Sequence, residues 1–224
     1  MAEAAAPPEL PDPDTLINRG LILQWLYWGL FWLMATPSVG VTISSLFNYP
    51  EYLGTSEFLT FGRLRPLHVN GVIFGAFSTL FIGLCYYLLP RLCGVRMWQE
   101  RWGYWLVWIW NLGLVGGMTL LALGHNQGLE AGEFPFVVDA VIFVVIGLLT
   151  VQFLVPISQR VEPQLYVAAW YLIGAFVWTV MNLILGSFIL PFAITGINSA
   201  AFHGLFIHYI VGLWITPAGY VLIY

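Results

Sequence analysis

Long apolar segments constrain the fold of this chain more than any other feature of its sequence. A transmembrane helix needs about 20 mainly apolar residues, and about six segments qualify: 20–46, 66–90, 103–124, 136–157, 165–191 and 199–224. The connections between them are short. The sequence therefore predicts an all-α integral membrane protein with about six transmembrane helices, forming one membrane domain over residues 19–224.

The composition excludes a soluble protein. Charged residues make up 8% of the chain, against roughly 25% in soluble domains. All seven basic residues are arginine, and they form no basic patch that would bind nucleic acid. Cys85 and Cys93 lie within and at the end of an apolar segment, without a CxxC pattern. We therefore expect reduced packing residues, and neither a thiolate metal site nor a covalently attached haem.

The arginines predict the orientation in the membrane. Residues 1–18 are rich in alanine, proline and acidic residues, which is typical of a disordered tail. If the tail is cytoplasmic, five arginines lie on the cytoplasmic side: Arg19, Arg91, Arg96, Arg101 and Arg160. Only Arg63 and Arg65 then lie outside. The positive-inside rule favours this topology for a multi-pass membrane protein.

A histidine stands at the start of the second apolar segment, directly after two arginines. Arg63 and Arg65 precede His68 by five and three residues. A haem needs an axial nitrogen for its iron and cations for its propionates, and this arrangement offers both near one membrane face. The alternative is an interfacial arginine pair with a histidine packed between helices. The spacing by itself leaves both open.

The other histidines differ in position. His125 lies in a polar loop, where we expect it to be solvated. His203 and His208 are five residues apart in the sixth segment. Five residues correspond to a rotation of about 140° from a common helix face, so we do not expect these two to bind one metal ion. His208 is the more deeply placed, and intramembrane histidines are functional candidates. It could instead hydrogen-bond to a neighbouring helix.

Three carboxylates precede or begin the fourth apolar segment. Glu130 and Glu133 are three residues apart, and Asp139 follows. The glutamate pair could bind a hard cation such as Ca²⁺, contact haem propionates or relay protons. Alternatively, it could simply stabilise a helix N-terminus. We expect Asp139 to lie within the apolar layer, where it needs a partner for proton transfer or for structure.

Four motifs together resemble one known family. Residues 61–70, FGRLRPLHVN, resemble almost letter for letter the second-helix motif of the catalytic subunit of cbb3-type (C-type) cytochrome c oxidases, which are haem-copper oxidases. Residues 130–139 are similar to its Glu-x-x-Glu-x-x-Trp-x-x-Asp stretch, and residues 166–176 to its next helix. Residues 208–216 resemble the helix that supplies the first copper ligand. The resemblance covers residues of roughly 20 to 224.

The resemblance implies a set of cofactors and roles. His68 would be an axial ligand of a low-spin haem b, with Arg63 and Arg65 at its propionates. Glu130 and Glu133 would lie near the propionates of a high-spin haem b3, with Glu130 a candidate ligand of bound Ca²⁺. His208 would be one of three histidines that bind copper. Such enzymes pass electrons from c-type cytochrome subunits to O₂, form water and move protons across the membrane.

Two departures limit the expected role. In the family, the remaining haem and copper ligands come from later helices, so we expect this chain to be the N-terminal half of subunit I, inactive alone and completed by a second half. The family also has a Trp-Trp-Tyr-Gly run before its copper-ligand histidine, whereas residues 204–207 are GLFI and His203 precedes them. Two alternatives therefore stay open: a nitric oxide-reducing relative and a non-catalytic haem b or scaffold subunit.

Overall fold

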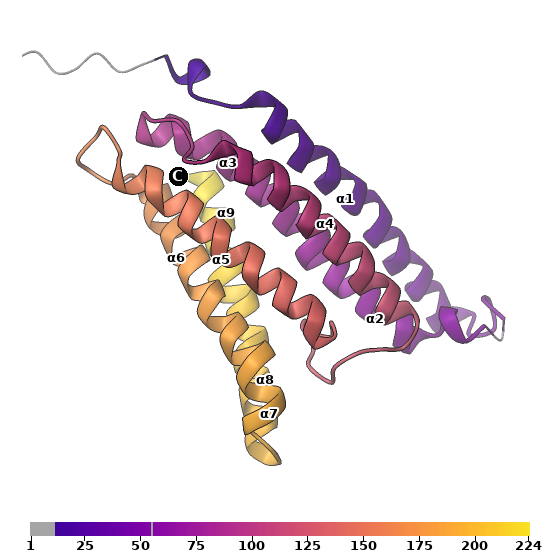
Figure 1. The fold of residues 1–224 in the computed structure, drawn as a ribbon. Helices are drawn as coiled ribbons and strands as arrows, with labels where there is room; N and C mark the ends of the chain where they lie inside the picture. The colour runs from indigo at the N-terminus through magenta and orange to yellow at the C-terminus, as the bar shows by residue number, and fades with distance from the viewer. Residues whose placement is uncertain (1–11, 55) are drawn as a thin grey trace, which may run out of the picture.

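The computed structural model describes residues 12–54 and 56–224, and in these residues it is helical without strands (Figure 1). Six continuous helices in the described part are long and apolar enough to cross a membrane. This confirms the all-α membrane fold. The first, third and fourth spans are α1 (Arg19–Asn48), α4 (Glu100–Ala122) and α5 (Phe136–Ser158).

The other three spans each contain a π-helical segment. The second comprises α2 (Phe61–Asn70), η3 (Gly71–Ser78) and α3 (Thr79–Cys93). The fifth comprises α6 (Val167–Leu183), η4 (Ile184–Ile189) and α7 (Leu190–Ala193), and the sixth α8 (Ile197–Tyr209), η5 (Ile210–Ile215) and α9 (Thr216–Ile223). Two short 3₁₀ helices, η1 (Pro13–Thr15) and η2 (Glu57–Leu59), precede the first and second spans. The apolar pattern did not predict the π segments, which often mark functional sites.

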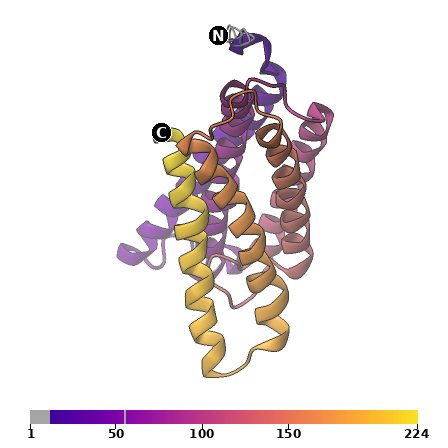
Figure 2. The ribbon, with the colours of Figure 1, turned by 90° about the vertical axis from the view of Figure 1, so that its left-hand side faces the viewer.

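Successive spans run in opposite directions, so their ends alternate between two sides (Figures 1 and 2). The start of α1 and the ends of α3, α5 and α9 share one side, and the connections 49–60, 123–135 and 194–196 share the other. The expected five-to-two division of arginines between the two sides follows from this arrangement. The start of α2, with Arg63 and Arg65, and the connection that carries Glu130 and Glu133 therefore belong to one membrane face.

A cluster of buried aromatic rings joins four of the spans. Trp214 of η5 makes edge contacts with Phe81 of α3 and Phe176 of α6, at 5.3 and 5.1 Å between ring centroids. Phe176 in turn meets Phe153 of α5 at 4.9 Å. Edge-to-face pairs of this kind stabilise by about 0.5–1.5 kcal/mol beyond their burial. The cluster fixes the sixth span against the second, fourth and fifth.

The segment before α1 is packed against the bundle. Leu16 is buried, Asp14 forms an ion pair with Arg91 at the end of α3, and Arg96 donates to the Thr15 carbonyl. The sequence predicted a disordered tail as far as residue 18. The structure differs from this prediction at residues 14–16, which contact the bundle. Residues 1–11 of the expected tail lie outside the described residues.

The close approach of the fifth and sixth spans generates the first prediction. A Cβ at Gly186 would lie 2.1 Å from a ring carbon of Phe206. Overpacking of this kind costs about 1–3 kcal/mol, so Gly186→Ala should lower the thermal unfolding midpoint of the detergent-purified protein. Gly174→Ala is the control, because its nearest atom would lie at an ordinary 3.7 Å. Equal midpoints for the two variants would contradict the close packing of Phe206 on Gly186.

Candidate functional site

His68 and Arg65 line one groove between α1 and α2. They are three residues apart on α2, which places them on one helix face. The groove has a volume of about 510 Å³, within the range of ligand sites. Its other lining residues come mostly from α1, and they are largely apolar: Pro37, Gly40, Val41, Ile43, Ser44, Phe47 and Phe61. The groove therefore combines an apolar wall with one imidazole and one cation.

The imidazole of His68 is fixed through one of its two nitrogens. Nδ1 lies 2.9 Å from the backbone carbonyl oxygen of Thr36 on α1, so the neutral tautomer with a proton on Nδ1 donates to this oxygen. No described residue forms a hydrogen bond with Nε2. A histidine that ligates a metal commonly donates its other ring N–H to a carbonyl or carboxylate in this way. The arrangement leaves Nε2 without a hydrogen-bond partner among the described residues, so this nitrogen could act as a metal ligand.

Arg65 joins α2 to the connection between α4 and α5. Its guanidinium forms ion pairs with Glu130 and with Glu133, the latter at 3.3 Å. Asn70, the last residue of α2, donates to the other carboxylate oxygen of Glu133 at 2.7 Å. The structure therefore brings together four residues that the sequence suggested for one membrane face: Arg65, His68, Glu130 and Glu133. Asn70 lies in the same motif, but the sequence alone suggested no role for it.

The two glutamates differ in environment. The Glu133 side chain is 5% exposed, whereas that of Glu130 is 58% exposed. Burial raises the pKa of Glu133 above its ordinary value, although the Asn70 hydrogen bond and the Arg65 charge both act to lower it. A buried carboxyl beside a cation can hold or release a proton near this face. Glu130 remains largely exposed beside the same cation.

Asp139 is buried in the first turn of α5 and has the partner that its position requires. Gln127 donates to its carboxylate at 2.8 Å, and the Gln127 backbone N–H donates to the Glu133 carbonyl at 2.9 Å. Gln127 therefore joins the Asp139 carboxylate to the backbone of Glu133, and so fixes the start of α5 against the loop that carries Glu133. The sequence indicated that Asp139 needed a partner, but Gln127, in an irregular loop, carried no signal that identified it.

Arg63 lies away from the groove. Residues two apart on a helix do not share a face, and Arg63 donates to the Ala122 carbonyl at the end of α4 at 2.9 Å. It also pairs with Glu57 at 3.5 Å and lies over the Phe58 ring, 5.3 Å from its centroid. Arg63 therefore holds the connection between the first two spans against the end of α4, and Arg65 alone lines the groove.

His208 and His203 project differently, in keeping with their spacing. His208 is exposed on α8, and its ring is near that of Tyr209. His203 is half-buried, with Nε2 3.3 Å from the Ser199 hydroxyl. In the described residues no group of three or more His, Cys, Asp or Glu side chains could hold a metal ion. Cys85 and Cys93 are buried and form no disulfide.

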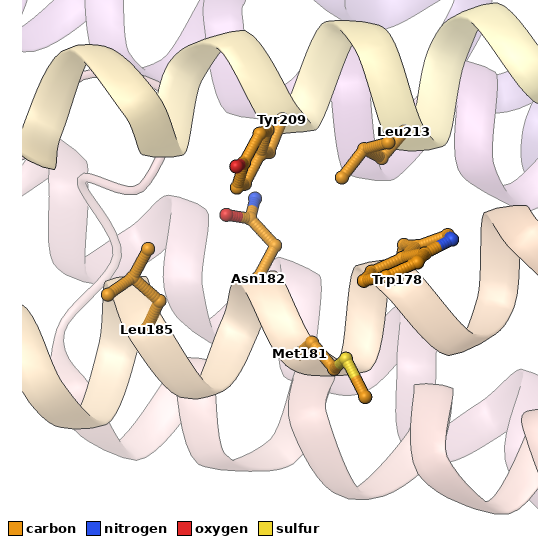
Figure 3. Close-up of a pocket in the computed structure, with 6 residues that line it drawn as sticks. All are labelled: Trp178, Met181, Asn182, Leu185, Tyr209 and Leu213. Carbon is orange, nitrogen blue, oxygen red and sulfur yellow. The ribbon is translucent and has the colours of Figure 1, made fainter.

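A second cavity lies between the fifth and sixth spans (Figure 3). One of its lining residues, Tyr209, directly follows His208 in the sequence. It has a volume of about 280 Å³ and is lined by Trp178, Met181, Asn182, Leu185, Tyr209 and Leu213. Asn182 donates to the Phe206 carbonyl at 3.2 Å, while its side-chain oxygen is buried without a hydrogen-bond donor among the described residues. The cavity is otherwise apolar.

These features define a multi-pass membrane protein with a histidine–arginine groove near one membrane face. The chain belongs to the family described as cytochrome c and quinol oxidase polypeptide I, whose family model matches residues 20–224. The match covers all six membrane spans. It includes the motifs that suggested a resemblance to the cbb3-type oxidase subunit.

Curated relatives agree with this membership. The chain is 29% identical over 193 residues to a cytochrome c oxidase subunit 1 homolog of Agrobacterium tumefaciens, covering 86% of the chain and 35% of the relative. It is 30% identical over 230 residues to the bacteroid homolog of Bradyrhizobium diazoefficiens, covering 98% and 42%. It is 27% identical over 167 residues to the cbb3-type subunit CcoN1 of Stutzerimonas stutzeri, covering 75% and 35%. The chain thus spans well under half the length of these relatives.

The environment of Glu133 generates a pH prediction. Because burial raises its pKa, more of Glu133 is protonated at a given pH above 4.5 than of an exposed glutamate. An infrared pH titration should show a carboxyl C=O band that fades at higher pH than the bands of exposed acids. Glu133→Gln should remove this band, and Glu130→Gln should leave it. The raised pKa of Glu133 would be refuted if the difference spectrum between the wild-type protein and Glu133→Gln showed no loss of such a band.

Proposed function

We propose that this chain is the N-terminal half of a cbb3-like haem-copper oxidase subunit I. It would contribute to the transfer of electrons from c-type cytochrome to O₂, coupled to proton translocation. One observation carries the proposal: His68 is held by its Nδ1, with Nε2 free, beside Arg65 in a largely apolar groove. The family match and the names of the relatives support the oxidase class.

The groove residues fit a low-spin haem b. His68 would ligate the iron through Nε2, because it lines the groove. Arg65 lines the same groove and would contact a propionate in addition to its two glutamates. A bound haem supplies a reversible one-electron carrier. Thr36 holds the imidazole in the tautomer that ligation needs. For Arg63, which faces the end of α4, a contact with a propionate stays a prediction from the resemblance.

The copper and calcium ions fit the described residues less well. Among the described residues no group of three His, Cys, Asp or Glu side chains could hold a metal ion, so His208 does not form a copper site with these residues. We propose that the other copper ligands, and those of haem b3, belong to the remaining half of the subunit. Calcium needs six to eight oxygen ligands, whereas Glu130 and Glu133 are both paired with Arg65. The described residues by themselves therefore do not form a complete site for either ion.

The buried carboxyls provide proton-holding groups near the same face. Glu133 is hydrogen-bonded to Asn70 and paired with Arg65, and Asp139 accepts from Gln127. In the proposed function, a charge change at the groove would reach Glu133 through Arg65. A proton held at Glu133 or Asp139 would compensate for that charge, which is the coupling that proton translocation needs.

We propose a bacterial inner membrane location with the N-terminus in the cytoplasm. Five of the seven arginines lie on the side where α1 begins, and the positive-inside rule favours the cytoplasm for that side. The groove and the carboxyls would then face the periplasm. The partners would be the remaining half of subunit I, c-type cytochrome subunits and the lipid bilayer.

The residues before His208 leave a second candidate open, a nitric oxide-reducing relative, because GLFI replaces the family's aromatic run. A non-catalytic haem b or scaffold subunit is the third. A CO difference spectrum of the purified assembly separates them: CO binding requires high-spin haem, and its absence leaves electron transfer or scaffolding. Metal analysis for copper then distinguishes O₂ chemistry from NO chemistry.

The ligand assignment is tested by replacing His68. His68→Ala should abolish the low-spin α-band in the reduced spectrum of the purified assembly, because no other histidine lines the groove. His125→Ala is the control, since His125 lies exposed in the connection after α4. An unchanged α-band in His68→Ala would refute the assignment.

The electrostatic role of Arg65 is tested by redox titration. Arg65→Ala removes a cation beside the groove and leaves the two glutamates without it. The loss of the cation and the uncompensated glutamate charges both make reduction of the haem less favourable, so its reduction potential should fall. The haem itself should remain bound, because His68 is unchanged. Arg63→Ala removes the same charge on the other side of α2, and its shift should be smaller. Equal shifts of the reduction potential in the two variants would show that Arg65 is no closer to the haem than Arg63.

A further inference from the structure

His68 packs against a glycine of α1 with no space for a side chain between them. A Cβ at Gly40 would lie 2.6 Å from Cε1 of His68, 2.8 Å from Nδ1 and 3.0 Å from Nε2. Cβ atoms essentially never approach other heavy atoms this closely, because such a separation is far inside van der Waals contact. The imidazole could accommodate an alanine here only by moving.

A reciprocal contact lies one helical turn away. Thr36 of α1 packs on Gly71, where a Cβ would lie 2.3 Å from its Cγ2. The Thr36 carbonyl also accepts the His68 Nδ1–H. Each of the two helices therefore contributes one glycine and one larger side chain, so α1 and the second span have a single close register at this depth. Small residues allow membrane helices to approach in this manner.

We propose that Gly40 is a positioning residue for His68. The glycine lets the ring lie against α1 in the plane that brings Nδ1 to the Thr36 carbonyl, and this contact fixes both the tautomer and the direction of Nε2. The inference rests on the proposed function of His68 as a haem ligand. The sequence alone suggested no role for Gly40, which lies outside all four motifs that resemble the oxidase family.

A purely structural role for Gly40 makes a different prediction. Glycine inside a helix is less favourable than alanine by about 1 kcal/mol, so Gly40→Ala would stabilise α1 if the site had space. If Gly40 served only helix packing, Gly40→Ala should affect the protein in the same way as Gly29→Ala. A Cβ at Gly29 of the same helix would lie 2.6 Å from Leu80, an equally severe contact away from His68.

The experiment compares three alanine variants in the intact, purified assembly. Gly40→Ala is the test, and Gly29→Ala is the control for tight packing on α1. Gly147→Ala is the control for the change itself, because no described atom would lie within 4 Å of its Cβ. Two properties of the low-spin haem are measured: the EPR g-values of the ferric state, and the rate of haem transfer to added apomyoglobin.

We expect Gly40→Ala to change the g-values, because they depend on the plane of the axial imidazole. We also expect it to weaken haem binding by about 10–100-fold, as loss of an outer-shell contact to a ligand typically does. Both controls should match the wild-type protein. The proposal is overturned if Gly40→Ala retains wild-type g-values and haem retention, or if Gly29→Ala causes the same changes.

A Gly40→Ala variant that fails to assemble is resolved by the double variant Gly40→Ala/His68→Ala. If the clash is with the imidazole, removing it should restore assembly to the level of His68→Ala, which a double-mutant cycle measures as coupling. No restoration would overturn the proposal. The proposed function fails separately: in that case the wild-type assembly itself would show no low-spin haem signal that depends on His68.

Discussion

The hydrocarbon layer of a membrane offers no water to polar groups, and this constraint governs the interior of the bundle. Each polar side chain there needs a partner from the protein, because an unpaired group costs several kcal/mol. Trp32 donates to Asn111 at 2.7 Å and Trp214 donates to Ser78 at 2.8 Å. Each bond links two spans that are distant in sequence. The polar groups thus specify which helices are neighbours, while the aromatic core supplies the bulk of the burial.

The same constraint places the groove. The His68 N–H is satisfied by a backbone carbonyl of α1, which requires α1 to approach closely. Gly40 and Gly71 permit that approach, since any larger residue would clash with His68 or Thr36. Arg65, one turn closer to the membrane face, is satisfied by two carboxylates from a loop outside the span. One helix face therefore changes from an ionic environment to an apolar one within three residues.

Hydrophobic length was sufficient to predict the spans. The expected segment 136–157 corresponds to Phe136–Ser158, and the expected segment 103–124 to Glu100–Ala122. The expected second span, 66–90, is shorter than Phe61–Cys93, because a helix can continue into the interface where Arg63 and Arg65 meet partners. The three π-helical segments could not be predicted, since they depend on how side chains of different spans interlock.

The site was predictable in its residue types but not in its contacts. The motif and the depth of His68 indicated a ligand, and the spacing of Arg65 placed it on the same face. Helix periodicity also separates Arg63 from Arg65, because residues two apart lie on different faces. The resemblance nevertheless assigned both arginines to the haem propionates. By contrast, Gln127 and Gly40 stand in segments whose local pattern gives no sign of their partners. Only the fold brings Gln127 to Asp139 and Gly40 to His68.

The surroundings of His208 differ from those of His68, Glu133 and Asp139. His68, Glu133 and Asp139, between the first four spans, all have hydrogen-bond partners. On the sixth span His208 is exposed, and the nearby Asn182 oxygen is buried without a described donor. Exposed imidazole within a membrane span is costly, which argues that this face is covered by protein in the assembly. The proposed function supplies such a cover, because it places the other copper ligands on helices that would pack against His208.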